Sequence, residues 1–450
     1  MIYAFNICNG CLGVPPTLPT PMWSAGCSND AVPVCSDGLG NNATELADLG
    51  QTWSTPLVIR VNGYTNPVLF MGGGWSDCLD ADTANLGSAC SKDTDLTDAV
   101  GGEVGSAVYA FDAVTGALLE KWETETPVVS SVIAADLVGE DGVADVAYAL
   151  DVGGSIYRFA FVTASGDILS AASTTDADGD GVPDAWTAAK IAGTTATDSD
   201  RLRFMNTPAV APVGTSGQKY VFLSFGAGDR EKPLKTNYPY DTGITYKFFT
   251  VIDRVFEWNV PNDSLGTALS LTNSDRVIDL DDLAPAPGTA NDKNTFGLFE
   301  VTESSSFQPG DSIANYDGWV FSLSTAGEQI VNPAAISGGR VFFNSYNPSG
   351  EGAACSALGS ARGYSLPLFS PAFDAGRDIE GGGIPIPPII ATVQLDENAA
   401  CVGDECDEES REPQVVTVCI GCEGFEPLPV EPTPGNTLRE IYRVENMDLQ

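Results

Sequence analysis

The sequence predicts an all-β protein, and three observations carry that prediction. Glycine and proline are frequent, at 48 and 29 of 450 residues, while apolar residues at the 3.6-residue period of a helix are scarce. Short apolar runs alternate with turn residues along the chain. A hairpin unit also recurs, in which proline opens a short apolar strand and a second β-branched or aromatic strand ends in glycine. We expect a β-propeller, because radial repetition of small sheets leaves only short, protected edges.

The hairpin unit occurs at five places. Its copies begin at Thr55, Thr126, Thr207, Asn332 and, less completely, Glu412. The prolines that open them are Pro56, Pro127, Pro208, Pro333 and Pro413, so the successive spacings are 71, 81, 125 and 80 residues. These spacings are too long and irregular for WD40 blades, but they suit propeller blades with insertions at the outer rim.

An outer hairpin is predicted over residues 108 to 122. A strand there ends at Asp112, a tight turn follows at Thr115 and Gly116, and a second strand runs to Trp122. This pattern is typical of the outer hairpin of PQQ-like propeller blades. We expect large aromatic residues to pack between blades, and we assign that role to Trp53, Trp75, Trp122 and Trp319.

The charge balance excludes several classes of function. The chain has 61 acidic and 21 basic residues, a formal charge of −40, and no histidine. Ser-His-Asp or Cys-His catalysis, c-type haem attachment and His-ligated metals are therefore excluded. So negative a field repels nucleic acid. No run of about 18 apolar residues predicts a membrane-spanning helix. Carboxylate pairs such as Asp80 and Asp82 lie in glycine-rich loops, and we expect no enzyme active site.

Eleven cysteines lie mostly in close pairs within Gly-, Asp- and Asn-rich stretches. This arrangement is typical of disulfides in an exported protein and favours an oxidising compartment. Two Cys-x-x-Cys units lie at opposite ends of the chain, and a closed ring would bring them together as a four-thiolate zinc site. Disulfides and zinc both stay open for these residues, and both imply that the chain ends meet: Cys8, Cys11, Cys419 and Cys422.

The opening MIYAFNICNG lacks the basic and long apolar regions of a signal peptide. We interpret the numbering as starting inside a longer protein or after a removed leader.

The segment DADGDGVPD has the spacing of a calcium loop. Side-chain oxygens stand at positions 1, 3, 5 and 9, glycine makes the tight turn, and the position-7 carbonyl completes an oxygen shell that suits Ca²⁺ better than Mg²⁺. Thr187 stands where an EF-hand has its last glutamate, so the loop resembles the shorter loops of thrombospondin-type and dockerin-like repeats. The alternative is a solvated loop without an ion. The predicted calcium ligands are Asp176, Asp178, Asp180, the carbonyl of Val182, and Asp184.

A second acidic loop, residues 136 to 145 (DLVGEDGVAD), is a weaker calcium candidate because it has one residue too many. When the loop is aligned on Asp141 and Asp145, positions 1 and 3 are Leu137 and Gly139, which offer no side-chain oxygen. Asp136 can contribute only if the loop bulges.

Several segments resemble the C-terminal propeller of PilY-type proteins, in that family's order, between residue 49 and about residue 366. They are LGQTWSTPLVIRVNGYTNPVLFMGGGW from Leu49, AADLVGEDGVADVAYALDVGGSIYRF from Ala134, FGAGDREKPL from Phe225, TYKFFTVIDR from Thr245, GWVFSL from Gly318 with the following GEQIVNPAAISGGRVFFNSYNPSG, and CSALGSARGYSL from Cys355.

The resemblance implies a modified propeller of about seven blades with long loop insertions. We expect residues 1–450 to form one domain. Within it, residues 1–48 would hold a cysteine-containing loop and a partial blade, 49–366 the family-like core, and 367–450 an acidic loop and the closing blade.

The resemblance also implies a function. Family members are exported with the type IV pilus system and act at the pilus tip in assembly, surface adhesion and twitching motility. Several bind calcium in a loop that corresponds to residues 136 to 145. We therefore expect a non-enzymatic, calcium-binding extracellular protein, exported through the periplasm, whose partners are minor pilins and a host or abiotic surface.

Two alternatives stay open. One is a PQQ-type quinoprotein dehydrogenase, although no two cysteines are adjacent and only one Asp-x-x-Thr-Gly unit is clear. The other is a secreted, lectin-like adhesion propeller unrelated to pili.

Overall fold

The structure is a computed structural model of the 450-residue chain. The residues that it describes are 1–6, 20–28, 34–76, 104–139, 141–163, 167–171, 185–194, 202–215, 218–230, 245–254, 277–286, 317–348, 359–369, 374–379, 383–394 and 415–420.

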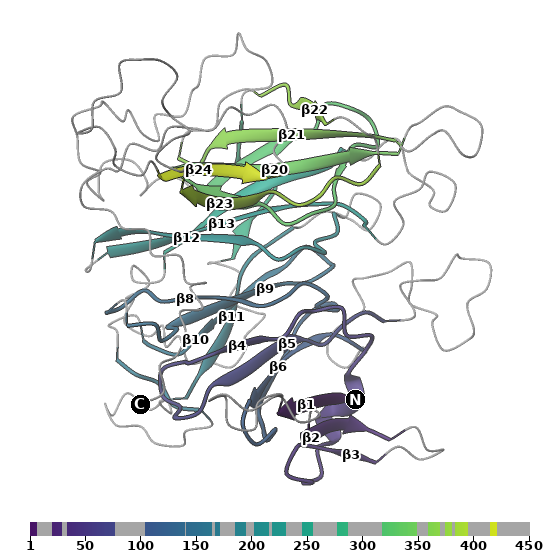
Figure 1. Ribbon diagram of the computed structural model, residues 1–450, viewed down its shortest axis with the longest axis vertical. Coiled ribbons are helices and arrows are strands. Elements are labelled where there is room, and N and C mark those ends of the chain that lie inside the picture. The colour runs from purple at the N-terminus through teal and green to yellow at the C-terminus, as the bar shows by residue number, and fades with distance from the viewer. Residues whose placement is uncertain are drawn as a thin grey trace, which may run out of the picture.

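The described chain folds into six β-sheets, apart from one 3-10 turn at Thr44–Asp48 (Figure 1). The all-β prediction is therefore confirmed. The first sheet contains β1 (Ile2–Asn6), β2 (Thr20–Cys27) and β3 (Cys35–Ser36). The second contains β4 (Leu57–Ile59), β5 (Val68–Gly72), β6 (Ala107–Asp112) and β7 (Leu118–Glu123). The third contains β8 (Ile133–Ala135), β9 (Val146–Leu150), β10 (Ile156–Ala160), β11 (Thr187–Gly193) and β15 (Ile278–Asp279).

The remaining sheets follow the same plan. The fourth contains β12 (Ala209–Thr215), β13 (Gln218–Gly226), β14 (Lys247–Asp253), β17 (Gly318–Ser322) and β16 (Ala284–Pro285). The fifth contains β18 (Gln329–Ile330), β19 (Ala335–Ser337), β20 (Arg340–Asn347), β21 (Ser360–Pro367) and β22 (Arg377–Ile379). The sixth contains β23 (Ile389–Gln394) and β24 (Val415–Ile420). Neighbouring strands are antiparallel, except that β15 and β16 pair in parallel with β11 and β17.

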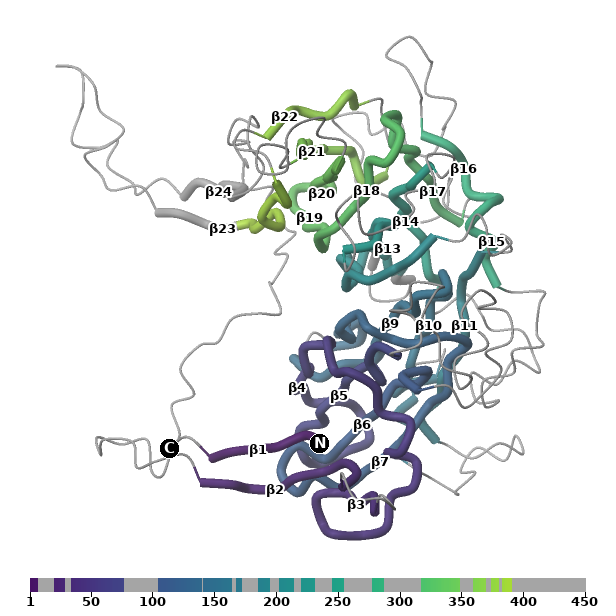
Figure 2. The backbone as a smooth tube through the Cα atoms, turned by 90° about the vertical axis from the view of Figure 1, so that its right-hand side faces the viewer, coloured from purple at the N-terminus to yellow at the C-terminus, as the bar shows by residue number. Residues whose placement is uncertain are grey.

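The sheets follow one another around an arc (Figure 2). Strands of consecutive sheets are in contact: β8 with β12, β12 with β19, and β19 with β23. This is the arrangement of propeller blades. Within the part of the chain that the structure describes, no strand of the first sheet pairs with a strand of the sixth. Closure of the ring and its blade count stay predictions.

The core lies between the sheets. Three clusters of buried apolar side chains join the first sheet to the second, the second to the third, and the third to the fourth and fifth. Because a sheet inside the stack is covered on both faces, strands such as β5, β6, β9 and β10 are buried at every position. This explains why they are continuous apolar runs rather than alternating patterns.

A chain of hydrogen bonds gives the true register of the repeat. The backbone N–H of Thr55 donates to Oγ of Ser131 (2.8 Å), and the N–H of Ser131 donates to Oγ1 of Thr207 (3.1 Å). Each step is 76 residues. The residue equivalent to Thr55 is thus Ser131 and not Thr126, so the predicted start of the second copy was wrong. Thr126 instead binds the N–H of Gly153 through its hydroxyl, between two sheets. The copy predicted from Glu412 contains β24, the second strand of its sheet rather than the first.

The predicted outer hairpin is confirmed. Oδ1 of Asp112 accepts the backbone N–H groups of Val114 and Thr115 in the turn between β6 and β7. Gly116 has a φ of +75°, and a Cβ at this position would lie 2.4 Å from the ring of Trp23. Only glycine fits both the backbone conformation and the close approach.

Three of the four tryptophans assigned to packing are buried, namely Trp75, Trp122 and Trp319. The fourth, Trp53, is 45% exposed, so its assignment was wrong. It precedes β4, and its ring is stacked on that of Trp75.

One predicted type of cross-link is present among the described residues. Cys27 and Cys35 form a disulfide with an S–S distance of 2.00 Å, which joins β2 to β3. This supports the oxidising compartment expected from the cysteine pairs. Of the helices searched in the described residues, none has the length and apolar character needed to cross a membrane.

Candidate functional site

The strand registers define two ends of each sheet. At the near end the first strand begins and the second strand ends, as Leu57 of β4 pairs with Phe70 of β5. At the far end lie the connection from the first to the second strand and the connection from the third to the fourth. At the far end of the third sheet, residues 136–145 join β8 to β9, and the described ends of the connection from β10 to β11 lie there too.

The first predicted calcium loop, Asp176, Asp178, Asp180, Val182 and Asp184, lies outside the described residues. Its base is described. Ser170 and Ala185 form a bridge, and the N–H of Trp186 donates to the carbonyl of Ser170 (3.1 Å). The described residues on either side of the predicted loop are therefore paired with each other.

The second loop is built around Asp145. This carboxylate is buried and accepts the N–H groups of Leu137 (2.6 Å) and Val138 (2.7 Å), while Asn62 donates its Nδ2–H at 2.6 Å. Asp136 accepts the N–H of Gly142 at 2.7 Å. The side chain of Asp145 thus points back into its own loop.

The calcium hypothesis for the second loop is not tested by this geometry. Among the residues that the structure describes, no group of three or more acidic or cysteine side chains could hold a metal ion. What the described residues show is a loop fastened by Asp145 as a hydrogen-bond acceptor.

Asn62 connects the two loops. While its amide N–H₂ binds Asp145, its backbone carbonyl accepts the indole N–H of Trp186 (3.0 Å). The following Gly63 is pressed against the carbonyl of Leu169, which a Cβ would approach to 1.7 Å. A turn of the second sheet therefore fastens both loops of the third. Sequence analysis missed this role, since Asn62 and Trp186 are 124 residues apart.

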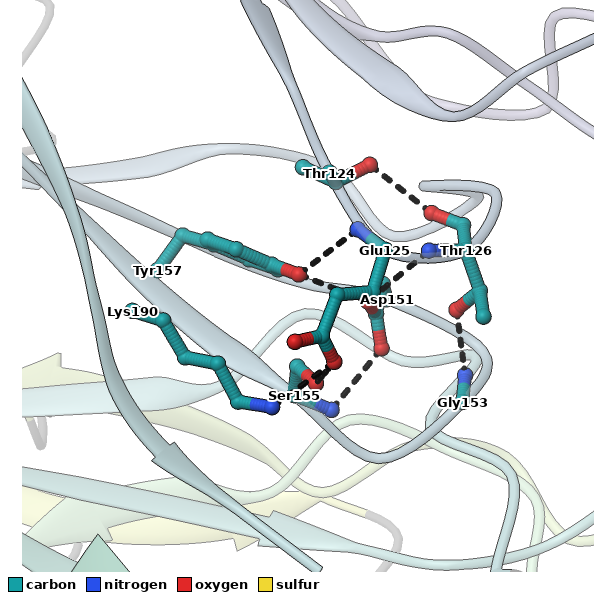
Figure 3. Close-up of polar contacts among 8 residues, drawn as sticks. All are labelled: Thr124, Glu125, Thr126, Asp151, Gly153, Ser155, Tyr157 and Lys190. Carbon is teal, nitrogen blue, oxygen red and sulfur yellow. Dashed lines mark hydrogen bonds and ion pairs between the residues drawn. The ribbon is translucent and has the colours of Figure 1, made fainter. Parts of the chain in front are cut away.

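A second polar cluster lies at the near end of the same sheet (Figure 3). Asp151, fully buried after β9, accepts the N–H groups of Ser155 (2.8 Å) and Thr126 (3.2 Å) and the phenol O–H of Tyr157 (3.0 Å). The carboxylate of Glu125 beside it accepts the hydroxyl of Ser155 (2.9 Å) and pairs with Lys190 (2.7 Å). The segment between β7 and β8 is thereby fixed to the turn between β9 and β10.

Burial dominates the electrostatics of this cluster. It raises the pKa of Asp151 to about 6, with a further upward contribution from the negative charge of Glu125. Burial also raises the pKa of Tyr157 well above its ordinary value. A neutral phenol that donates to one acid is suited to holding the turn. The hydrogen bonds of this cluster join residues of the protein to one another, which indicates a structural role.

The four cysteines considered for disulfides or zinc do not enter the described site. Cys8, Cys11 and Cys422 lie outside the described residues, and of Cys419 only its backbone pairing with Ile390 is described. That prediction stays open.

The fold and site together define an all-β protein of stacked, blade-like sheets, with a loop fastened by Asp145 at the far end of the third sheet. No protein-family model matches the chain, and no curated protein sequence matches it. Among solved structures, the crystal structure of the Pseudomonas aeruginosa PilY1 C-terminal domain is similar, with 14% identity and a TM-score of 0.48, over 84% of this chain and 73% of that chain. A similarity at this level says nothing about function.

Proposed function

We propose that this protein is a calcium-binding, non-enzymatic propeller of the type IV pilus system that acts outside the cell in pilus assembly and surface attachment. One observation supports the proposal most. The segments that resemble PilY-type proteins fall on strands of four consecutive sheets: β4 and β5; β8 to β10; β13, β14 and β17; and β18 to β21. The resemblance therefore covers the repeated body of the fold rather than isolated turns.

The extracellular part of the proposal is supported by the disulfide between Cys27 and Cys35 and by the charge of −40. Disulfides persist in oxidising compartments. A high net charge keeps a protein soluble.

The calcium part of the proposal is supported by the ligand spacing from Asp176 to Asp184 and by the backbone bridge between Ser170 and Ala185. A ligand that binds only the folded protein stabilises it, by about 2.7 kcal/mol at a hundredfold excess over Kd. We expect calcium to raise the unfolding temperature. The double variant Asp178→Ala/Asp180→Ala should lose most of that shift, while the exposed Asp378→Ala should keep it. A shift unchanged in the double variant would contradict this site.

The pilus part of the proposal has its own test. Purified protein should retain minor pilins of the source organism on a column, and deletion of its gene should reduce surface pili. Without pilin retention and with normal piliation, the pilus assignment is wrong even if calcium binds.

The non-enzymatic part is tested with added PQQ, an alcohol and a dye acceptor. Turnover above that of a buffer control would favour the dehydrogenase alternative.

A further inference from the structure

Trp53 is an exposed aromatic side chain held in a fixed position. The backbone N–H of Trp53 donates to the carbonyl of Gln51 (3.0 Å), and Gln51 exchanges two backbone hydrogen bonds of 2.8 and 2.7 Å with Trp75. The indole of Trp53 lies parallel to that of Trp75, with an interplanar angle of 4° and a centroid distance of 5.1 Å. Because Trp75 is fully buried, it is a rigid support. Trp53 therefore loses little conformational entropy when it binds a partner.

Trp75 already makes a cation–π contact within the protein. The guanidinium of Arg203 lies over the ring of Trp75, 5.8 Å from its centroid, and pairs with Asp229 at 3.0 Å. Tryptophan is the best aromatic partner for such a contact. The neighbouring, solvent-exposed indole of Trp53 offers the same chemistry to a group from outside.

The charge of the chain selects the kind of partner. With 61 acidic and 21 basic residues, the protein attracts cations and basic segments. At the near end, where Trp53 lies, the carboxylates of Glu123 and Glu125 end β7 and begin the next connection, and their side chains are 59% and 35% exposed. Glu125 is already paired with Lys190, whereas the more exposed Glu123, 3.6 Å from Lys121, can pair with charges that flank a bound cation.

We propose that Trp53 anchors a docking site for a basic segment of a partner protein, with a lysine or arginine side chain stacked on the indole. This role goes beyond the proposed calcium and pilus functions and does not depend on either. Exposed tryptophans that rest on a rigid support are typical hot spots of protein interfaces.

The test uses a decapeptide of alternating lysine and glycine, measured by titration calorimetry in moderate salt. A cation–π contact contributes about 0.5 to 2 kcal/mol, so Trp53→Leu should weaken binding about 2- to 30-fold and Trp53→Phe by less. Neither substitution changes the charge of the protein, so a loss of affinity reports the indole itself. The matched control is Val58→Ala, which alters an exposed apolar residue of β4 and should bind like the wild type.

Equal affinity of Trp53→Leu and the wild type would overturn the proposal. So would equal binding of a glutamine–glycine decapeptide, or binding of neutral glycans that Trp53→Leu abolishes while peptide binding persists. If Trp53→Leu lowers the unfolding temperature, the proposal is judged from Trp53→Phe instead. That variant should bind the lysine–glycine peptide more weakly than the wild type, and equal affinity would overturn the proposal.

Discussion

Asp145 and Asp151 stand at the two ends of strand β9, and they show how differently one fold uses a buried carboxylate. Both are fully buried, and burial raises the pKa of both. At the far end, Asp145 accepts three hydrogen bonds of 2.6–2.7 Å, which oppose the effect of burial. At the near end, Asp151 accepts longer ones of 2.8–3.2 Å beside the charge of Glu125, and its pKa reaches about 6.

Burial is the main cause of the raised pKa at both carboxylates, and their neighbours modify it. The N–H groups of Leu137 and Val138 lower the pKa of Asp145 against burial and the charge of Asp136. At Asp151 the N–H of Ser155 lowers the pKa, and the charge of Glu125 raises it. At the far end Asp145 fastens its loop as a hydrogen-bond acceptor. The near end holds a turn with an acid that takes up a proton in mildly acidic solution.

The largest loss of stability is expected at a third buried carboxylate. It lies in the contact between two sheets rather than at either end of β9. Asp253 of β14 pairs with Arg158 of β10 at 2.6 Å, and both side chains are inaccessible to solvent. Asp253→Ala should cost about 3–5 kcal/mol of the free energy of unfolding, because it leaves a buried guanidinium without its carboxylate. Urea unfolding measures this loss.

The control is a pair of the same kind whose carboxylate is exposed. Asp317 is 52% exposed and pairs with Arg254 at 2.5 Å, so Asp317→Ala should cost less than about 1 kcal/mol. Equal losses in the two variants would show that burial of the pair does not matter.

The pH dependence of stability separates the two ends directly. Since the pKa of Asp151 rises from 3.8 to about 6 on folding, the folded protein keeps a proton there that the unfolded chain has lost. The stability contributed by Asp151 is present below pH 4 and is lost as pH rises through 6, by about 3 kcal/mol. Asp151→Asn should remove this slope from a series of unfolding curves.

Asp145→Asn is the matched comparison. The pH slope of stability that Asp145 contributes has the same sign as that of Asp151, because burial raises both pKa values. It should be smaller, because three short hydrogen bonds oppose the rise at Asp145. A slope as large as that of Asp151 would remove the distinction between the two ends.

The smallest effect concerns the fastening of the far end by Asn62 and Gly63. Gly63 and Gly142 have φ values of +78° and +80°, so alanine is strained equally in both places, by about 1–2 kcal/mol. Only at Gly63 would the new Cβ meet a carbonyl, whereas nothing lies within 4 Å at Gly142. Gly63→Ala should therefore cost about 1–3 kcal/mol more. Equal unfolding temperatures of the two variants would mean that the contact with Leu169 can relax.

Patterns within a short stretch of chain were predicted well. The turn from Asp112 to Gly116 was predicted correctly because it is local: the side chain of Asp112 accepts backbone N–H groups two and three residues ahead. Errors arose where a similar local pattern has another partner. Thr126 and Pro127 resemble Thr55 and Pro56 in sequence, but the residue that continues the chain of hydrogen bonds is Ser131.

The same limit applies to the candidate site. The calcium spacing at Asp176 to Asp184 is visible in nine residues, but the residue that links this loop to its neighbour is not. Asn62 reaches Asp145 across 83 residues and Trp186 across 124. No periodicity or motif records such pairs.

By itself, the sequence determined that the protein is built of β-strands, that histidine chemistry is excluded, and that its field is strongly negative, because these depend on composition and on local patterns. Only the tertiary structure decided that Trp53 faces solvent, that Asp145 and Asp151 differ, and that Asn62 joins two loops. Exposure, pKa and contact depend on which distant segments pack together, and this packing is a property of the whole fold.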